Sequence, residues 1–150
     1  GLDGKLVGVG SLFVGAAPEP GTQGPGNMFV PIDLLKPIMA TMIATGRSGV
    51  PPRPWLGVYP AEAEGRVFVS RVSGDGPGAE AGLKPGDIIV GVKGRRVSGM
   101  ADFYRKVWAE GAAGIDVALD VLPMGAGNLE IKRVTIYSRD RHQWLQLRRE

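Results

Sequence analysis

Few residues in this sequence could carry nucleophilic chemistry. A serine that attacks a peptide bond needs a histidine within hydrogen-bonding reach and an acid that orients that histidine. The single histidine, His142, lies in a basic stretch near the end of the chain, and we interpret it as a solvated residue. The serines all lie outside a G-x-S-x-G or similar motif: Ser11, Ser48, Ser70, Ser73, Ser98 and Ser138. We therefore expect no catalytic residue in this chain.

Metal and thiol chemistry is not indicated either. The sequence has no cysteine, which excludes disulfides, thiol nucleophiles and zinc–thiolate sites. One histidine and scattered carboxylates do not have a spacing typical of metal ligands. The sequence therefore predicts neither a metal site nor a cofactor.

The stretch Trp55-Leu56-Gly57-Val58 indicates a different chemistry, the binding of another polypeptide. An extended peptide can add as a strand to the edge of a sheet, and successive backbone N–H groups can hold its terminal carboxylate. Gly57 provides the small residue that such a close approach requires. Leu56 and Val58 would form apolar walls for the last side chain of the peptide. Arg53 could attract the carboxylate, although a surface arginine beside prolines is usually only solvated.

A helix predicted from Met100 to Trp108, with Ser98 as its cap, would provide the opposite wall. Met100, Phe103 and Val107 fall on one face of this helix at i, i+3, i+7 spacing. An apolar helical face most often packs into a core, so core residues are the alternative. Together with the Trp55–Val58 stretch and the signature A-G-L-x-x-G-D-x-I of residues 81–89, we interpret the three as a pocket for peptide side chains.

Glycine (24) and proline (12) divide the chain into short elements, which favours a β-rich architecture over a helical bundle. We expect a turn and a strand in residues 1–14, a loop in 15–27, and then a short strand followed by a helix that Asp33 caps and Gly46 ends. The apolar stripe of that helix needs a partner surface, so residues 1–46 are not expected to be self-sufficient. Residues 47–54 form a proline-stiffened linker.

From Trp55 onward the turns recur regularly, and the sequence predicts one small domain over residues 55–138. Residues 66–72 alternate with period two and residues 88–92 are apolar, as expected for strands with a face in the core. Residues 61–65 are expected to be a loop. The prediction is a mainly β, α+β fold, a partly open β-barrel or sandwich with two helices. Residues 139–150 are expected to be a basic tail.

The charge pattern argues against nucleic acid as a partner, and the apolar pattern argues against a membrane span in this chain. The net charge is +3 and the pI about 9.4, but no stripe of Lys and Arg interleaved with aromatic residues occurs. No apolar run reaches the roughly 18 residues of a membrane span. Because the chain opens at Gly1 without methionine, we expect it to be a fragment of a longer protein.

Three pieces of the second block resemble a bacterial PDZ domain of the HtrA (high-temperature-requirement) serine protease family: residues 53–58, residues 76–89 and the helix from Met100 to Trp108. The central piece is the most specific, because the order A-G-L-x-x-G-D-x-I is characteristic of PDZ domains in such proteases. The first block fits the same family. Residues 3–9 and 29–46 resemble late strands and the C-terminal helix of a trypsin-like β-barrel.

The resemblance implies a peptide-binding module that captures apolar C-terminal ends of polypeptides, such as unfolded proteins expose, and regulates an attached protease domain in the periplasm or cell envelope. The catalytic serine of the family, in a Gly-Asn-Ser-Gly-Gly-like loop, would lie just before Gly1, with the histidine and aspartate further upstream. The chain alone should then be inactive, although its parent is expected to be a serine endopeptidase. Gly10, Ser11 and Leu12 fall where that fold pairs a strand with substrate; the alternative is an ordinary barrel strand.

Two other functions are open. The parent could be a non-catalytic interaction scaffold, such as a pseudoprotease or a secretion-type protein. Block 1–46 could also mediate self-association, because it carries an apolar helical stripe that would be an exposed patch in a monomer: Ile38, Met39, Met42 and Ile43. The partners expected are therefore polypeptide C-termini, the rest of the protease domain, or a second copy of the chain.

Overall fold

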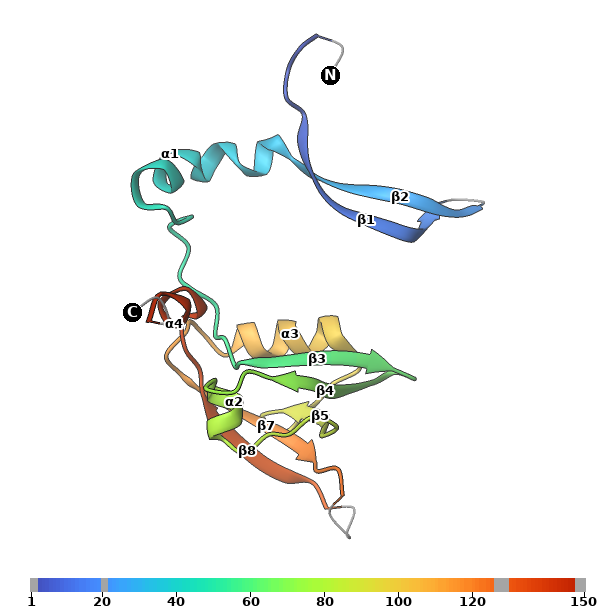
Figure 1. Cartoon of the computed structure of the whole chain (residues 1–150), viewed down its shortest axis with the longest axis vertical. Helices are drawn as coiled ribbons and strands as arrows, with labels where there is room; N and C mark the ends of the chain where they lie inside the picture. The colour runs from blue at the N-terminus through green and yellow to red at the C-terminus, as the bar shows by residue number, and fades with distance from the viewer. Residues whose placement is uncertain (1–2, 20–21, 126–129, 148–150) are drawn as a thin grey trace. The chain divides into compact units, whose positions relative to one another are not determined.

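The computed structural model describes residues 3–19, 22–125 and 130–147, and the chain forms two compact units, Gly1–Val50 and Pro51–Glu150 (Figure 1). Within the described residues, no helix has the length and apolar character that crossing a membrane requires. The same residues contain no cluster of three or more side chains suited to holding a metal ion.

The first unit is a two-stranded hairpin followed by a helix. Strand β1 (Gly8–Glu19) pairs antiparallel with β2 (Thr22–Pro31). A short 3-10 helix, η1 (Ile32–Leu34), leads into α1 (Lys36–Thr45). Gly46 then ends the helix with a φ of +70°, in the left-handed conformation that glycine adopts without steric cost.

The hairpin corrects the prediction of a loop over residues 15–27. Both strands run through this stretch, and their register continues to the pair Glu19 and Thr22 on either side of residues 20–21, which lie outside the described part. The prediction was wrong because it considered only the burial of apolar side chains. Two paired strands satisfy their backbone N–H and C=O groups across the ladder, whatever the side chains are.

The start of α1 also differs from expectation. Asp33 lies in η1, and the N-cap of α1 is Leu35, which makes no side-chain capping bond. Pro37 lies in the first turn, where its missing N–H costs nothing. The helix buries none of its residues, and the side chain of Ile43 is 80% exposed. The apolar stripe is therefore uncovered within the first unit.

The second unit is one antiparallel sheet with three helices. The strand order is β3 (Val58–Ala63), β4 (Arg66–Val72), β5 (Ile88–Val92), β7 (Asp116–Leu122) and β8 (Lys132–Tyr137), and the short β6 (Arg95–Arg96) pairs with β5. This mostly β, α+β architecture with short helices confirms the predicted fold class.

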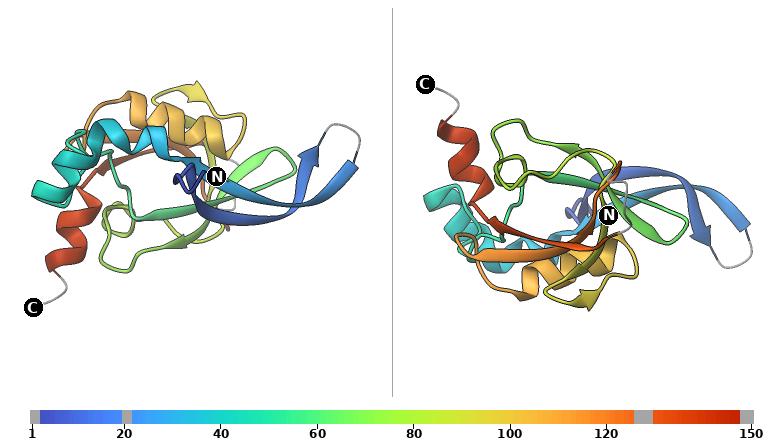
Figure 2. Two further views of the ribbon diagram at one scale, coloured as in Figure 1. Left: turned by 90° about the horizontal axis from the view of Figure 1, so that it is seen from above. Right: turned by 90° about the horizontal axis from the view of Figure 1, so that it is seen from below.

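Three helices accompany this sheet in the described residues, two of them between strands. Helix α3 (Met100–Ala109) contacts β3 and β5, whereas the short α2 (Pro77–Glu80) contacts β8, so the two cover different parts of the sheet (Figure 2). The third, α4 (Arg141–Leu147), follows β8 directly. Residues 139–147 are therefore folded, in contrast to the predicted tail.

The core of the second unit follows the alternation of its strands. In β4, Val67 and Val69 are buried while their neighbours face outward, as the period-two pattern predicted. In β7 the inward side chains are Val117, Leu119 and Val121. Full burial of a side chain of this size stabilises the fold by about 1.5–3 kcal/mol. Helix α3 and strand β8 complete the cluster with Phe103, Val107 and Ile136.

Strand β3 is longer than predicted. It runs to Ala63 and absorbs part of the expected loop 61–65, because only Glu64 and Gly65 form the turn to β4. Both turn residues have positive φ, +51° and +70°, as a two-residue hairpin turn requires. The extension places Glu62 in the strand, one residue before its end.

The sequence signature from Gly76 to Ile89 has a structural role in each part. Leu83 and Ile89 are core residues. The carboxylate of Asp87, itself buried, accepts hydrogen bonds from the backbone N–H of Lys84 at 2.9 Å and of Met124 at 3.1 Å. Asp87 therefore fixes the turn before β5 and the chain that follows β7.

Candidate peptide-binding edge

Strand β3 lies at one edge of the sheet, and α3 runs beside it (Figure 1). In the described part of the unit, β3 pairs with β4 on one side and with no strand on the other. This edge is where the sequence predicted that a peptide would add. The residues that lead into it, 53–57, decide whether a terminal carboxylate could be held there.

The segment that leads into β3 is fixed through its carbonyl groups. Trp55 exchanges two backbone hydrogen bonds with Arg139, each 3.0 Å long. The carbonyl of Leu56 accepts from the N–H of Gly78, and that of Gly57 from the N–H of Ser73, both at 2.8 Å. The N–H groups of Leu56 and Gly57 form no hydrogen bond with any described residue. The stretch therefore presents donors and keeps its acceptors occupied.

Gly57 is required by conformation and by packing. Its φ is +67°, and a Cβ atom there would lie 3.1 Å from Cδ of Pro77 and 3.2 Å from the Cα of Gly76. The start of the signature at residues 76–78 thus packs directly against this loop. The sequence analysis explained Gly57 by the close approach of a ligand carboxylate. In the structure, the close contact at Gly57 is made by Gly76 and Pro77 at the start of α2.

The predicted pocket residues divide into buried and exposed members. Leu56 and Val58 are buried, and so are Phe103 and Val107 of α3, which are both 2% exposed. These four belong to one core cluster. Met100, at the start of α3, is 38% exposed. Their role as a pocket for peptide side chains stays a prediction.

Two aromatic contacts flank the loop. The ring of Trp55 packs on that of Trp144 from α4, with centroids 4.5 Å apart. The guanidinium of Arg53 lies over the ring of Trp108, 3.9 Å from its centroid, in a cation–π contact. Arg53 is thereby held next to α3, while its proposed action on a carboxylate stays a prediction.

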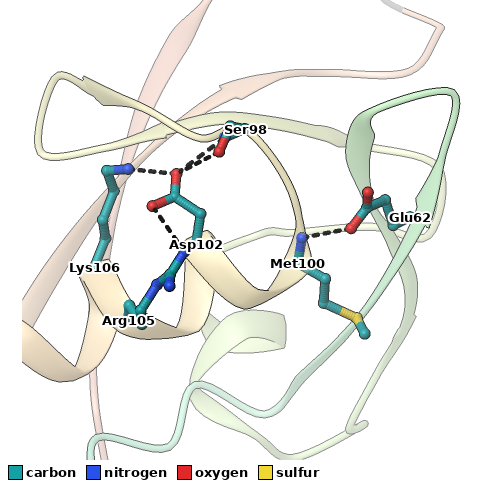
Figure 3. Close-up of polar contacts among 6 residues, drawn as sticks. All are labelled: Glu62, Ser98, Met100, Asp102, Arg105 and Lys106. Carbon is teal, nitrogen blue, oxygen red and sulfur yellow. Dashed lines mark hydrogen bonds and ion pairs between the residues drawn. The ribbon is translucent and has the colours of Figure 1, made fainter. Parts of the chain in front are cut away.

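The first turn of α3 is stabilised by two carboxylates (Figure 3). The N-cap is Gly99 and makes no side-chain capping bond, which corrects the assignment of Ser98 as the cap. Ser98 instead donates from its backbone N–H and its hydroxyl to the carboxylate of Asp102, at 3.0 and 3.1 Å. Lys106 also donates to Asp102. The bonds from Lys106 and then Ser98 lower the pKa of Asp102 to about 2.

The second carboxylate comes from β3 and was missed by the sequence analysis. Oε2 of Glu62 accepts a hydrogen bond of 2.7 Å from the backbone N–H of Met100 (Figure 3). Glu62 thus satisfies a free donor at the helix N-terminus, where negative charge is favourable. Extending the strand pattern from Val58 to Ala63 would have placed Glu62 on the same face as Val58.

The predicted substrate strand lies in the first unit. Gly10 is paired with Phe29 and Leu12 with Met28, and the register shifts at Ser11 between them. These residues are part of the β1–β2 hairpin, and their contact with a protease substrate stays a prediction.

Comparison with known families identifies the second unit. Residues 54–127 match the PDZ domain family, so the fold and the edge described above belong to a PDZ domain. A Bacillus subtilis protein named serine protease Do-like HtrA is 25% identical over 139 residues, which cover 82% of this chain and 30% of that protein. A Brucella suis protein named probable periplasmic serine endoprotease DegP-like is 31% identical over 133 residues, 80% of this chain and 24% of that protein.

Solved structures agree with these matches. The serine endoprotease from Yersinia pestis is 27% identical, with a TM-score of 0.55, over 91% of this chain and 44% of that one. The HtrA-type protease AlgW, solved with a decapeptide, is 25% identical with a TM-score of 0.58, over 92% of this chain and 43% of that one. The chain thus contains a PDZ domain and is homologous to HtrA/DegP serine proteases over most of its length. It spans only 24–30% of the length of the curated relatives described here and of a similar Bartonella henselae protein.

Proposed function

We propose that the second unit binds the C-terminal ends of polypeptides by adding them as a strand to the free edge of β3. One observation carries this proposal: the N–H groups of Leu56 and Gly57 have no partner in the described structure, next to an edge strand in a PDZ domain. Successive N–H groups of this kind can hold a carboxylate. The similar protease AlgW was solved with a decapeptide, which supports the proposal that this chain also binds a peptide.

The last side chain of the ligand would pack where the loop meets α3. Leu56, Val58, Phe103 and Val107 share one apolar cluster, and an apolar ligand side chain would extend it. Met100 is exposed at the start of α3 and would contact the ligand further from the ligand's C-terminus. Arg53, held on Trp108, would add a positive charge near the carboxylate. The expected ligands are therefore apolar C-termini, such as those of unfolded proteins.

A titration with two forms of one peptide tests carboxylate capture. An apolar-ended octapeptide with a free C-terminus should bind, and its amidated form should bind at least tenfold more weakly, because hydrogen bonds to a charged group contribute about 1.5–3 kcal/mol. Fluorescence anisotropy of N-terminally labelled peptides measures both affinities. Equal affinities, or no binding of either peptide, would reject the proposal.

For the whole protein we propose a periplasmic serine endopeptidase in which peptide binding to the PDZ domain regulates cleavage, with coupling through the linker 47–54 and α1. Its support is the homology to proteins named periplasmic serine endoproteases. In that protein Gly10, Ser11 and Leu12 would pair with substrate. A full-length protein that cleaves unfolded casein, and does so faster with the free-acid peptide, would agree. A full-length protein without proteolytic activity would favour the interaction scaffold.

The exposed stripe of α1 favours a second candidate function, self-association. Met39, Met42 and Ile43 are 47%, 39% and 80% exposed, which is unusual for neighbouring apolar side chains. Analytical ultracentrifugation of the chain over a hundredfold concentration range tests this. A mass that rises with concentration and returns to the monomer value in an Ile43→Glu variant would support self-association, and a constant monomer mass would reject it.

A further inference from the structure

The direction of the backbone groups along β3 can be followed from its partner strand. The N–H of Val69 donates to Asp87, and its carbonyl accepts from Gly86, both at 2.8 Å, so both groups of Val69 face β5. Pro60 is the residue opposite Val69 in the β3–β4 register. In an antiparallel pair, opposite residues either exchange both hydrogen bonds or none. The backbone of Pro60 therefore faces the free edge of the sheet.

The same conclusion holds for Val58. Val58 lies two residues before Pro60 in β3, and backbone groups two residues apart along a strand point to the same side; the single bond from Ser73 to the carbonyl of Gly57 places that preceding carbonyl on the β4 side, in agreement. Val58 and Pro60 consequently present their backbone groups to an incoming strand. Proline has no N–H, so the edge offers a carbonyl at Pro60 but no donor. The following outward N–H belongs to Glu62, whose carboxylate already joins β3 to α3.

We propose, on the basis of the proposed function, that Pro60 makes recognition of the ligand backbone asymmetric: opposite Pro60, β3 binds the N–H of the ligand residue but not its carbonyl. With the terminal carboxylate at Leu56–Val58, the N–H of the last ligand residue reaches the carbonyl of Val58. The residue third from the end lies opposite Pro60: its N–H donates to the Pro60 carbonyl, whereas its own carbonyl receives no donor from β3. The amide N–H at this ligand position is a determinant of binding, and its carbonyl is not.

Amide-to-ester replacement in the bound octapeptide tests this directly. An ester that removes the N–H of the third-last residue should weaken binding threefold to tenfold, the range expected for one net hydrogen bond of about 0.5–1.5 kcal/mol. An ester at the penultimate residue weakens the carbonyl of the third-last residue as an acceptor, and its missing N–H points away from β3. This peptide should bind within twofold of the all-amide peptide.

A Pro60→Ala variant provides the reciprocal test. The restored N–H should raise the affinity for the all-amide peptide about threefold to tenfold, and the penultimate ester should cancel that gain. Pro85→Ala, in an exposed turn before β5, is the matched control and should leave all affinities unchanged. Circular dichroism and thermal melting show that each variant is folded; should Pro60→Ala not fold, the two esters on the unmodified chain still decide the question.

The outcomes separate this inference from the proposed function. A threefold or greater loss with the penultimate ester on the unmodified chain, or no gain in folded Pro60→Ala, overturns the asymmetric reading while strand addition stands. If the ester at the third-last residue has no effect, strand addition itself is wrong. If no apolar-ended peptide binds at millimolar concentration, both the proposed function and this inference are wrong.

Discussion

The indole rings of Trp55 and Trp144 pack on each other, with centroids 4.5 Å apart, across a β-bridge between Trp55 and Arg139. The guanidinium of Arg139 also pairs with both carboxylate oxygens of Glu80, at 2.8 and 2.9 Å. The chain after β8 therefore holds the segment that leads into β3. Trp55 directly precedes the free N–H groups of Leu56 and Gly57. Helix α4 therefore supports the proposed carboxylate-binding loop through the contact of Trp144 with Trp55.

Replacing Trp144 by alanine should reduce both stability and peptide affinity. The aromatic pair contributes about 0.5–1.5 kcal/mol beyond its buried area, so urea unfolding should show a loss of about 1–2 kcal/mol. Peptide affinity should fall because Trp55 loses the contact that positions the loop. Leu145→Ala, on an exposed side chain of the same helix, is the control and should change neither property. A Trp144→Ala protein with unchanged stability and affinity would show that α4 does not support the loop.

Comparing Gly57→Ala with Gly65→Ala separates the cost of a left-handed backbone from the cost of steric crowding, because the two glycines have nearly the same φ. Both residues have a left-handed backbone, +67° and +70°, which costs an alanine about 1–2 kcal/mol. A Cβ at Gly65 meets no atom within 4 Å, whereas one at Gly57 would crowd Pro77. Gly57→Ala should therefore destabilise the domain more than Gly65→Ala, by about 1 kcal/mol or more in urea unfolding. Equal losses of unfolding free energy in the two variants would mean that the loop at Gly57 can shift away from α2 without cost.

The fold was predictable where single residues carry strong local preferences. Gly46 ends α1 as predicted, and the alternation of Val67 and Val69 marked a strand with one buried face. Strand lengths were less predictable. Residues 15–19, 22–27 and 61–63 are poor in apolar side chains, and they are strands because a partner strand pairs with their backbones.

The candidate site was predictable in its location but not in its contacts. The pattern placed Trp55–Val58 opposite α3 in the expected order, yet it could not show that Phe103 and Val107 are fully buried or that Trp55 packs on Trp144. Those contacts join residues far apart in sequence. The role of Pro60 also depends on the β3–β4 register, which shifts between Tyr59 and Pro60 and so cannot be counted from the turn alone.

Asp102 should make the stability of the second unit dependent on pH. Its folded pKa is about 2, below its ordinary value of 3.8, because Lys106 and Ser98 hydrogen-bond to the carboxylate. A lowered pKa means that the stabilisation is present above the ordinary value and is lost as the pH falls through the range from about 4 to 2. Asp102→Asn should be less stable than the unmodified chain at pH 7, and the difference should shrink at pH 2.5. Urea unfolding at both pH values measures it; a difference independent of pH would show that the charge of Asp102 is not what stabilises α3.

Glu62 should stabilise α3 through its side chain alone. Glu62→Ala removes the acceptor for the Met100 N–H and should cost about 1 kcal/mol, the usual effect of losing a helix N-terminal cap. Glu62→Gln keeps an acceptor oxygen and loses only the favourable charge at the helix N-terminus, so it should cost less, about 0.3–1 kcal/mol. Glu64→Ala, at the exposed turn between β3 and β4, is the matched control for removing an acidic side chain. The φ of Glu64 is positive, but glutamate and alanine both disfavour this conformation, so the substitution adds no backbone strain. Urea unfolding ranks the three variants, and a Glu62→Ala protein as stable as the unmodified chain would show that the bond between β3 and α3 contributes nothing to the fold.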